Sequence, residues 1–356
     1  MQSSKILIFG GTFDPFHNGH FEILNQAEKL FQFDKIFIVP NYVSPTKELK
    51  SLTSDFDRVE MIKLAIEQKP NWSISMFELE RKQPSYTIET IEHFTSLNSN
   101  SEIFLLIGVD QWNQFHLWKR YEEILAKCKI IIAKRDNEEI EHKFNIIPYT
   151  LPGIDINISS TNIRHKPTLY SLNYKVLNYI NEHGLYAIDR IKPLMSQKRF
   201  EHSLRVAYMA KDLMNHYDPI NNNLAFTAGI YHDIAKEMHF DKQINIAEDI
   251  LGITKYDSPK VLHGYIGSYI LRNEYYFNNQ LILDAISRHT KIYDFYTTKP
   301  TLLDKVIYLA DKLEPNRTDE DVFGQKIDEY RKLAYKNIDQ CFEKLYNWLQ
   351  INLSKK

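Results

Sequence analysis

The most informative segment of the sequence is GGTFDPFHNGH, which runs from Gly10 to His20. An apolar run at residues 5–9 precedes it and is typical of a buried strand, and apolar residues recur at helical spacing over residues 21–30. A strand, a glycine turn and a helix in this order predict a phosphate-binding loop, because glycines let an anion approach the backbone and the free amides of a helix start attract it. His17 and His20 are three residues apart, so both imidazoles can face a bound triphosphate. The alternative is an ordinary strand-to-helix turn with two solvated histidines.

Length and composition restrict the classes of protein to consider. The chain has 356 residues, which is long for a single hydrophobic core and predicts two domains. Its 44 basic and 46 acidic side chains give a net charge of −2, which argues against nucleic acid or an acidic membrane as a partner and favours small ligands. The two cysteines, Cys128 and Cys341, are too few for a disulfide framework or a cysteine-built zinc site. We find no signal segment and no apolar run of ~18 residues, so we expect a cytoplasmic protein; the oligomeric state stays open.

Two kinds of pattern divide the chain. In the first half, apolar runs that begin at Lys35, Ile103 and Lys129 alternate with helical stretches, which predicts a doubly wound α/β fold with a parallel sheet and helices on both faces. After HGLY at residues 183–186 the strand signal ends, and the second half reads as all-α. Its helical patterns cover residues 201–217, 223–236 and 302–313. We place the boundary between two domains of residues 1–188 and 189–356.

A second phosphate-binding element closes the first half. In ISSTNIR, residues 158–164, the side chains of Ser159, Ser160 and Thr161 are helix-capping types, and Arg164 adds a positive fork. Taken alone, such a cluster usually marks only a helix start. Paired with the loop from Gly10 to His20, it predicts the other half of a triphosphate clamp.

Together these motifs resemble the HxGH-type nucleotidyltransferase superfamily, and more narrowly the bacterial nicotinate-nucleotide adenylyltransferases, over roughly residues 5–186. Further matching segments are VPNYVSPTKE at 39–48, Arg58 with Met61, PSYTIET at 84–90, IGVD at 107–110, Trp118 and YINEHGLY at 179–186. The resemblance implies a Rossmann-like fold and the reaction of ATP with nicotinate mononucleotide to give deamido-NAD and pyrophosphate, with Mg²⁺ on the phosphates. The element Ser85-Tyr86-Thr87 and Trp118 look like the nicotinate branch; the alternative is a nicotinamide-mononucleotide adenylyltransferase.

The resemblance also implies roles for individual residues. Because the mononucleotide phosphate is already a nucleophile, the protein can act by positioning and by charge stabilisation, with His17, His20 and Arg164 as catalytic residues. Trp118 would stack on the pyridine ring; its alternative is an ordinary core aromatic. The implied ATP-binding residues are Gly10, Gly11, Thr12, Phe13, His17, His20, Ser159, Ser160, Thr161 and Arg164. The implied mononucleotide-binding residues are Lys47, Arg58, Tyr86, Thr87, Gly108, Asp110 and Trp118.

The second half contains a separate set of metal-ligating residue types. Six imidazole and carboxylate donors lie on separate predicted helices: His202, His232, Asp233, His263, His289 and Asp311. Nitrogen and oxygen donors without thiolate suit iron, manganese or zinc, and six donors exceed what one open catalytic ion takes from protein. The set therefore predicts two ions, although each residue taken singly is more often an ordinary polar side chain.

The sequences around these donors resemble the YqeK-type HD-domain phosphohydrolases over roughly residues 191–349. The matching segments are RFEHSLRV at 199–206, AGIYHDIAKE at 228–237, LHG at 262–264, AISRHT at 285–290 and YLADKLEPNR at 308–317. The resemblance implies symmetrical hydrolysis of diadenosine tetraphosphate to two ADP molecules. It also implies a dinuclear metal centre, of iron ahead of manganese or zinc, in which Asp233 is a catalytic residue that bridges the two ions. Lys236 and Arg317 would contact phosphate. The alternative is a non-catalytic, metal-bound nucleotide sensor.

Overall fold

A computed structural model describes residues 3–42, 53–134, 139–141, 143–153, 158–254, 259–290, 292 and 299–353. The chain divides into two compact units, Met1–Val176 and Leu177–Lys356. The predicted boundary at 188/189 lies inside the second unit, because the residues before it already pack there: the Asn181 amide donates to the carbonyl of Tyr275 at 3.0 Å and accepts from Arg190 at 3.1 Å. The compact units do not test where the two domains meet in the sequence, so the boundary at 188/189 stays a prediction.

The first unit is built on a six-stranded sheet in which all neighbouring strands are parallel. The order is β3-β2-β1-β4-β5-β6, which confirms the predicted doubly wound class. The strands are β1 Ser4–Gly11, β2 Lys35–Pro40, β3 Trp72–Ile74, β4 Ser101–Gly108, β5 Lys129–Ala133 and β6 Tyr149–Thr150.

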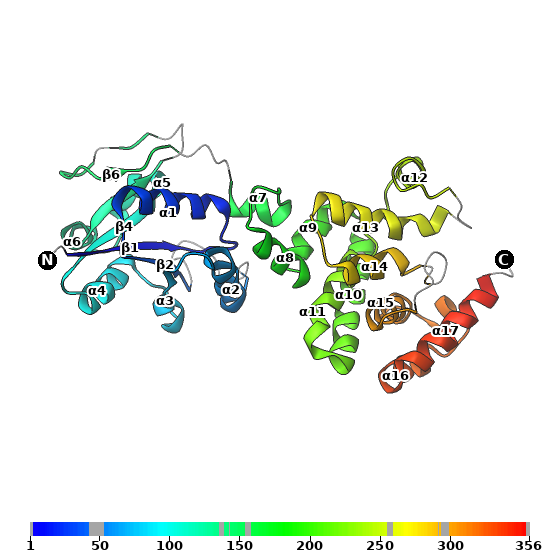
Figure 1. The fold of residues 1–356 in the computed structure, drawn as a ribbon. Helices are drawn as coiled ribbons and strands as arrows, with labels where there is room; N and C mark the ends of the chain where they lie inside the picture. The colour runs from blue at the N-terminus through cyan, green and yellow to red at the C-terminus, as the bar shows by residue number, and fades with distance from the viewer. Residues whose placement is uncertain are drawn as a thin grey trace. The chain divides into compact units, whose positions relative to one another are not determined.

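Helices cover both faces of this sheet, as predicted (Figure 1). Ile6 and Ile8 of β1 pack with Ile88 and Ile91 on one face, and the intervening Leu7, which is fully buried, points to the other. In Figure 1, α1 (Asn18–Phe31) lies over one face, and α2 (Asp55–Ile66), α3 (Phe77–Glu80) and α4 (Thr87–Leu97) lie over the other. Helix α5 (Val109–Asn113) follows β4, and its Val109 and Trp112 belong to the same core cluster as Ile88 and Ile91 of α4. The remaining helices of this unit are α6 Tyr121–Lys127 and α7 Ser160–His165.

The strand order reverses between β1 and β4, which are direct neighbours. In open parallel sheets, ligands bind in the crevice outside the carboxyl ends of the strands at this reversal. Gly10 and Gly11 end β1, and Gly108 ends β4. The fold therefore brings the first glycine motif and the IGVD segment together.

The second unit is helical throughout its described residues. Its helices, from α8 at the junction onward, are α8 Tyr174–Glu182, α9 Ala187–Ile191, α10 Gln197–Tyr217, α11 Asn222–Tyr231, α12 Phe240–Asn245, α13 Leu262–Glu274, α14 Gln280–Arg288, α15 Leu302–Leu313, α16 Ile327–Lys336 and α17 Ile338–Leu353. Helices α10 and α11 cross closely at Gly229, where a Cβ atom would lie 2.8 Å from the Cα of Ala207. None of the helices described in either unit combines the length and the apolar character needed to cross a membrane.

One predicted helix differs in the structure. The pattern over residues 223–236 predicts a single helix, but α11 ends at Tyr231 and a turn follows. His232 and Asp233 therefore stand on the turn, where successive side chains can point into one space.

Candidate active sites

The two histidines of the glycine motif form the start of α1. His17 Nδ1 accepts from the amide of His20 at 3.3 Å, and His20 Nδ1 accepts from the amide of His17 at 3.2 Å. The rings are stacked with their centroids 3.6 Å apart. Since Nδ1 is the acceptor in both neutral rings, the proton is on Nε2, which makes each Nε2–H a hydrogen-bond donor of the kind that binds phosphate oxygen.

A cavity of about 330 Å³ lies at the ends of β1 and β4. The predicted site residues that line it are Gly10, Gly11, Phe13, His17, His20, Gly108 and Asp110. Gln111 and Lys134 also line it and were not predicted. Lys134 directly follows β5, so its place at the carboxyl edge of a parallel sheet is the signal that could have identified it.

The second phosphate element contacts the first. Ser160 Oγ donates to the carbonyl of Pro15 at 3.1 Å, and Arg164 Nη1 donates to the carbonyl of Asp14 at 2.8 Å. The two motifs, far apart in sequence, are therefore joined as the clamp hypothesis requires. Ser159 caps α7 as predicted, and Arg164 also donates to Thr161 Oγ1 at 3.1 Å. These side chains do not line the cavity, so their contact with ATP stays a prediction.

Arg58 lies behind the loop. Its side chain is fully buried and donates to the carbonyls of Thr12 at 2.7 Å and Asn41 at 2.8 Å, and it also pairs with Asp55. Neither Arg58 nor Thr12 lines either of the two cavities at this sheet edge. This geometry supports a role in holding the loop, and contact of Arg58 with the mononucleotide stays a prediction. Lys47 lies outside the described residues.

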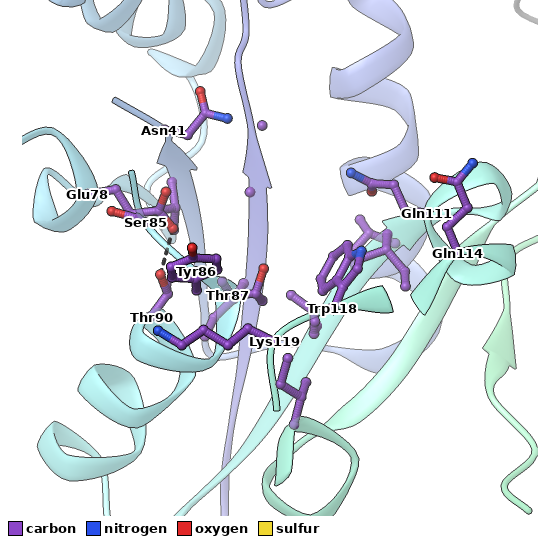
Figure 2. A pocket seen from close by; sticks show the side chains of 18 of the residues that line it. Asn41, Glu78, Ser85, Tyr86, Thr87, Thr90, Gln111, Gln114, Trp118 and Lys119 are labelled. Carbon is purple, nitrogen blue, oxygen red and sulfur yellow. Dashed lines mark hydrogen bonds between the residues drawn. The ribbon is translucent and has the colours of Figure 1, made fainter. Parts of the chain in front are cut away.

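A larger cavity of about 390 Å³ adjoins the first and shares Gly10, Gly11 and Gln111 with it. Tyr86, Thr87 and Trp118 line it as predicted for a mononucleotide site. In Figure 2, Trp118 lies across the cavity from Tyr86 and Thr87. The fully buried core tryptophan of this region is Trp112, whereas Trp118 is only partly buried. Trp118 also packs against the core cluster, with its ring centre 4.9 Å from that of Phe115, so its stacking on a ligand stays a prediction.

Two charged side chains in this cavity were not predicted. Glu78 is buried and accepts from Thr90 Oγ1 at 2.6 Å; burial raises the pKa of its carboxyl group, although the bond to Thr90 opposes this. The Lys119 ammonium lies 4.0 Å from the centre of the Tyr86 ring and 3.6 Å from a carboxylate oxygen of Glu89. Lys119 is adjacent to Trp118 in sequence, and this adjacency was an available signal.

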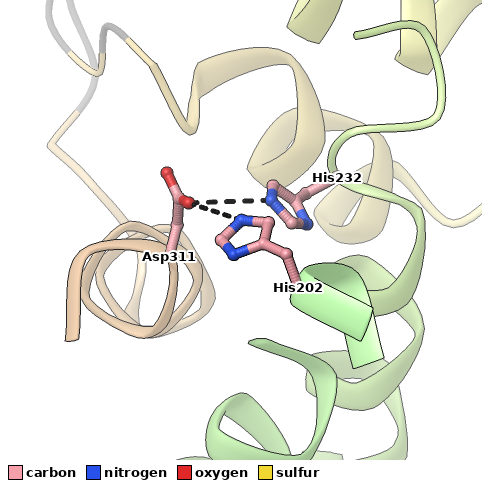
Figure 3. A group of neighbouring side chains, drawn as sticks. All are labelled: His202, His232 and Asp311. Atoms are coloured by element: carbon pink, nitrogen blue, oxygen red, sulfur yellow. Dashed lines mark hydrogen bonds and ion pairs between the residues drawn. The ribbon is translucent and has the colours of Figure 1, made fainter. Parts of the chain in front are cut away.

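All six predicted metal donors converge in the second unit. His202 stands on α10, His263 on α13 and Asp311 on α15; His232 and Asp233 stand on the turn after α11, and His289 ends α14. His202 Nε2 lies 3.1 Å and His232 Nε2 lies 3.8 Å from the same oxygen of Asp311 (Figure 3). The donor atoms of these three residues lie within 4.8 Å of one another, and so do those of His232, Asp233 and His289.

The two oxygens of Asp233 face different histidines. Oδ2 lies 3.4 Å from His232 Nε2 and 3.9 Å from His202 Nε2. Oδ1 lies 3.0 Å from His263 Nε2 and 3.6 Å from His289 Nε2. We call the group of His202, His232, Asp311 and Asp233 Oδ2 the first metal position. The group of His263, His289 and Asp233 Oδ1 is the second metal position.

The histidine rings are prepared for metal binding. Nδ1 of His232, His263 and His289 lies 2.6 to 2.8 Å from a backbone carbonyl three residues earlier. A carbonyl can only accept, so Nδ1 carries the proton and Nε2 keeps its lone pair. Among the described residues, no hydrogen-bond partner reaches the buried Nε2 of His232. The Nε2 atoms of His263 and His289 are 3.0 Å apart. Two ligands of one ion, each at about 2.0–2.1 Å from it, are separated by a similar distance, so the residues fit a metal.

The charges at this site also suit metal and phosphate. Burial alone would raise the pKa values of the Asp233 and Asp311 carboxyl groups. The imidazoles around Asp233 instead hold its pKa well below the usual range. Lys312 and His202 do the same for the pKa of Asp311. Burial lowers the pKa of His289 to about 4, so this ring is neutral at neutral pH. Of the two predicted phosphate contacts, Lys236 Nζ lies 3.2 Å from His263 Nε2, and Arg317 Nη2 lies 3.4 Å from an Asp311 oxygen.

Residues 8–166 match the cytidylyltransferase-like family, and residues 199–316 match the HD domain family. A protein of Mycoplasma genitalium named "Probable nicotinate-nucleotide adenylyltransferase/Ap4A hydrolase" is 38% identical over 343 residues, which cover 95% of each chain. The chain belongs to the family of this relative, in which a nicotinate-nucleotide adenylyltransferase part and an HD domain stand in one chain. Both resemblances drawn from the sequence are therefore confirmed at the level of the family.

Other similar proteins cover one half each. The nicotinate-nucleotide adenylyltransferase of Bacillus subtilis is 37% identical over 187 residues, which are 51% of this chain and 98% of that protein. A solved structure from Clostridium acetobutylicum, titled "predicted HD superfamily hydrolase involved in NAD metabolism", is 28% identical with a TM-score of 0.40. It covers 48% of this chain and 86% of its own.

Proposed function

We propose that the first unit transfers the adenylyl group of ATP to nicotinate mononucleotide, giving deamido-NAD and pyrophosphate. The observation that carries this proposal is the pair of adjoining cavities at the sheet reversal, which share Gly10, Gly11 and Gln111. One holds the stacked histidines, and the other holds Trp118. Two nucleotides bound there would bring the mononucleotide phosphate next to the triphosphate, as direct transfer requires.

The reaction in this site is an in-line displacement. A phosphate oxygen of the mononucleotide attacks the α-phosphorus of ATP, one P–O bond forms, and the bond to the β-phosphate oxygen breaks as pyrophosphate leaves. The Nε2–H groups of His17 and His20 would donate to oxygens that gain charge, and Arg164 would bind the leaving side. Mg²⁺ would accompany ATP and neutralise part of the triphosphate charge.

The wall of the larger cavity favours the acid over the amide substrate. Tyr86 and Thr87 stand at the start of α4, whose positive end favours a negative group, and Glu89 already accepts from the Tyr86 amide there. Lys119 lines the cavity and carries a positive charge, and Arg81 pairs with Glu89 beside it. A carboxylate on the pyridine ring would be attracted there, whereas a carboxamide gains less. The amide-specific enzyme remains the alternative.

Competition between the two mononucleotides in one reaction tests the assignment. The chain is incubated with ATP, Mg²⁺ and equal amounts of nicotinate and nicotinamide mononucleotide, and both dinucleotide products are quantified. We expect deamido-NAD to form with the higher kcat/KM. Equal kcat/KM values for the two substrates would support the amide alternative, and formation of neither product would overturn adenylyl transfer.

For the second unit we propose metal-dependent, symmetrical hydrolysis of diadenosine tetraphosphate to two ADP molecules. The observation that supports it is that the two oxygens of Asp233 face two separate histidine groups, as a residue that bridges two ions must. When bound, iron, or manganese or zinc in its place, would supply a hydroxide nucleophile and neutralise developing charge. Lys236 and Arg317 would bind the phosphate chain, and the histidines would hold their Nε2 atoms toward the metal.

Product analysis distinguishes this activity from its alternative, a non-catalytic nucleotide sensor. The full chain is loaded with Fe²⁺ or Mn²⁺, incubated with diadenosine tetraphosphate, and its products are separated by chromatography. We expect ADP alone. Equal amounts of AMP and ATP would exclude symmetrical cleavage, and saturable binding without any product would favour the sensor.

A further inference from the structure

The four metal-facing histidines differ in what holds them. Three of them donate Nδ1–H to neutral backbone carbonyls, as described above. His202 is different, because its Nδ1 lies 3.2 Å from Oε1 of Glu314, a carboxylate. Its Nε2 lies 3.1 Å from Asp311 on the opposite side of the ring. His202 therefore stands between a metal-facing carboxylate and a carboxylate with no place among the metal donors.

Glu314 is itself tightly held. Its side chain is only 3% exposed, its Oε2 accepts from Arg205 Nε at 2.6 Å, and the backbone amide of Asn316 donates to the same oxygen at 2.9 Å. Oε1 faces Nδ1 of His202 at 3.2 Å, and it also lies 3.4 Å from Arg205 Nη2 and 3.9 Å from Arg317 Nε. A carboxylate that accepts from the outer nitrogen of a metal-binding histidine fixes the tautomer and raises the basicity of the inner nitrogen.

Donor number also separates the two metal positions. As defined by the distances above, the first has four donor atoms, two of them carboxylate oxygens, and the second has three, of which one is a carboxylate oxygen. His232 also lies within 4.8 Å of the donor atoms of Asp233 and His289. Cations flank both positions: Arg199, Lys312 and Arg317 near the first and Lys236 near the second. Among the described residues, the carboxylate behind a histidine is found at the first position only.

We propose that Glu314 is a positioning residue that orients His202 and thereby makes the first metal position the tighter of the two. The inference rests on the metal site of the proposed function, and it adds a residue outside the donor set and an order of loading. An ion enters the first position before the second. Loss of the Glu314 charge weakens the first position without changing its donor atoms.

Co²⁺ titration of the metal-free full chain tests the proposal, with calorimetry and the visible absorption of bound Co²⁺ as readouts. The wild-type chain is expected to take up Co²⁺ in two steps, the first tighter than the second. Glu314→Ala is expected to weaken the first step by about 10- to 100-fold and to leave the second step within a few-fold. Glu314→Gln keeps an oxygen for His202 but no charge, so we expect it to recover only part of the loss.

Glu237→Gln is the matched control, because Glu237 binds Ser196 instead of a histidine and lies in the same unit. It should titrate like the wild-type chain. Thermal unfolding of each metal-free variant checks the fold, and the conservative Gln variant carries the test if the Ala variant does not fold. The proposal would be overturned if Glu314→Ala and Glu314→Gln both fold and bind the first Co²⁺ as tightly as the wild-type chain. It would also be overturned if both binding steps weakened equally. A wild-type chain that binds no Co²⁺ would instead remove the metal site.

Discussion

At the scale of single residues, the histidine pair has two tasks. His17 and His20 cap α1 with their Nδ1 atoms and keep Nε2–H for a ligand, so the helix start and the phosphate site use opposite sides of the same rings. A substitution can therefore damage both the helix and the chemistry. The two effects can be separated because glutamine at the third helical position can also accept from the capping backbone amide.

His20→Ala is expected to lower kcat for adenylyl transfer by about 10²–10³-fold, or ~3–4 kcal/mol, because a donor to the transition-state charge is lost. His20→Gln should keep the helix cap and lose nearly as much turnover. Steady-state kinetics with ATP and nicotinate mononucleotide measure the effect, and circular dichroism checks the helix content. Near-normal turnover of the Ala variant would mean that the motif is not the transfer site.

Glu78 provides a pH-dependent test at the same scale. Burial raises its pKa in the folded chain, so its ionisation costs stability as pH rises from the unfolded value through the folded one. Glu78→Gln removes this cost and keeps an acceptor for Thr90. Thermal unfolding from about pH 5 to about pH 8 should show the variant gaining in Tm relative to wild type as pH rises. A Tm difference that does not change with pH would refute the shifted ionisation.

At the scale of elements, sequence patterns predicted the long, regular parts. The strands β1, β2, β4 and β5 were identified because their apolar runs are long enough to show a pattern. The strands β3 and β6, with three and two residues, are too short for any periodicity, and their pairing with neighbours defines them. The end of α11 at Tyr231 was missed because the apolar pattern continues across the turn.

The candidate sites follow the same division. Motifs identified the six residues that converge in the second unit because each stands in a segment that resembles the HD-domain family. Glu314 and Glu78 were not predicted because their contacts depend on which side chains the fold brings beside them, whereas Lys119 could have been found from its adjacency to Trp118. Arg58 donates to the carbonyls of Thr12 and Asn41, and its predicted contact with the mononucleotide stays a prediction.

The position of Arg58 gives a prediction for the element that it holds. Arg58→Met would leave the carbonyls of Thr12 and Asn41, two partly buried residues, without this donor, at a cost of about 1–3 kcal/mol each at most. We expect a lower unfolding temperature and raised KM values for both ATP and nicotinate mononucleotide, because the loop serves both cavities. Kinetics that show a raised KM for the mononucleotide alone would instead indicate direct contact with that substrate.

At the scale of the whole molecule, the chain joins two sets of functional residues that share no member. The proposed transfer residues lie in the unit Met1–Val176, and the metal donors lie in the unit Leu177–Lys356. Each unit has its own hydrophobic core, so neither site needs a side chain from the other. We therefore expect the two activities to be chemically independent within one polypeptide.

Crossed inactivation of the full chain tests this central claim most directly. Wild type, His20→Ala and Asp233→Ala, with Asp233→Asn as the isosteric control, are assayed in parallel for deamido-NAD formation, for ADP from diadenosine tetraphosphate and for bound metal. We expect His20→Ala to lose only adenylyl transfer, and both Asp233 variants to lose metal and ADP formation but to keep adenylyl transfer. Retained hydrolysis in a metal-depleted Asp233 variant, or an equal collapse of adenylyl transfer in a folded one, would contradict this claim.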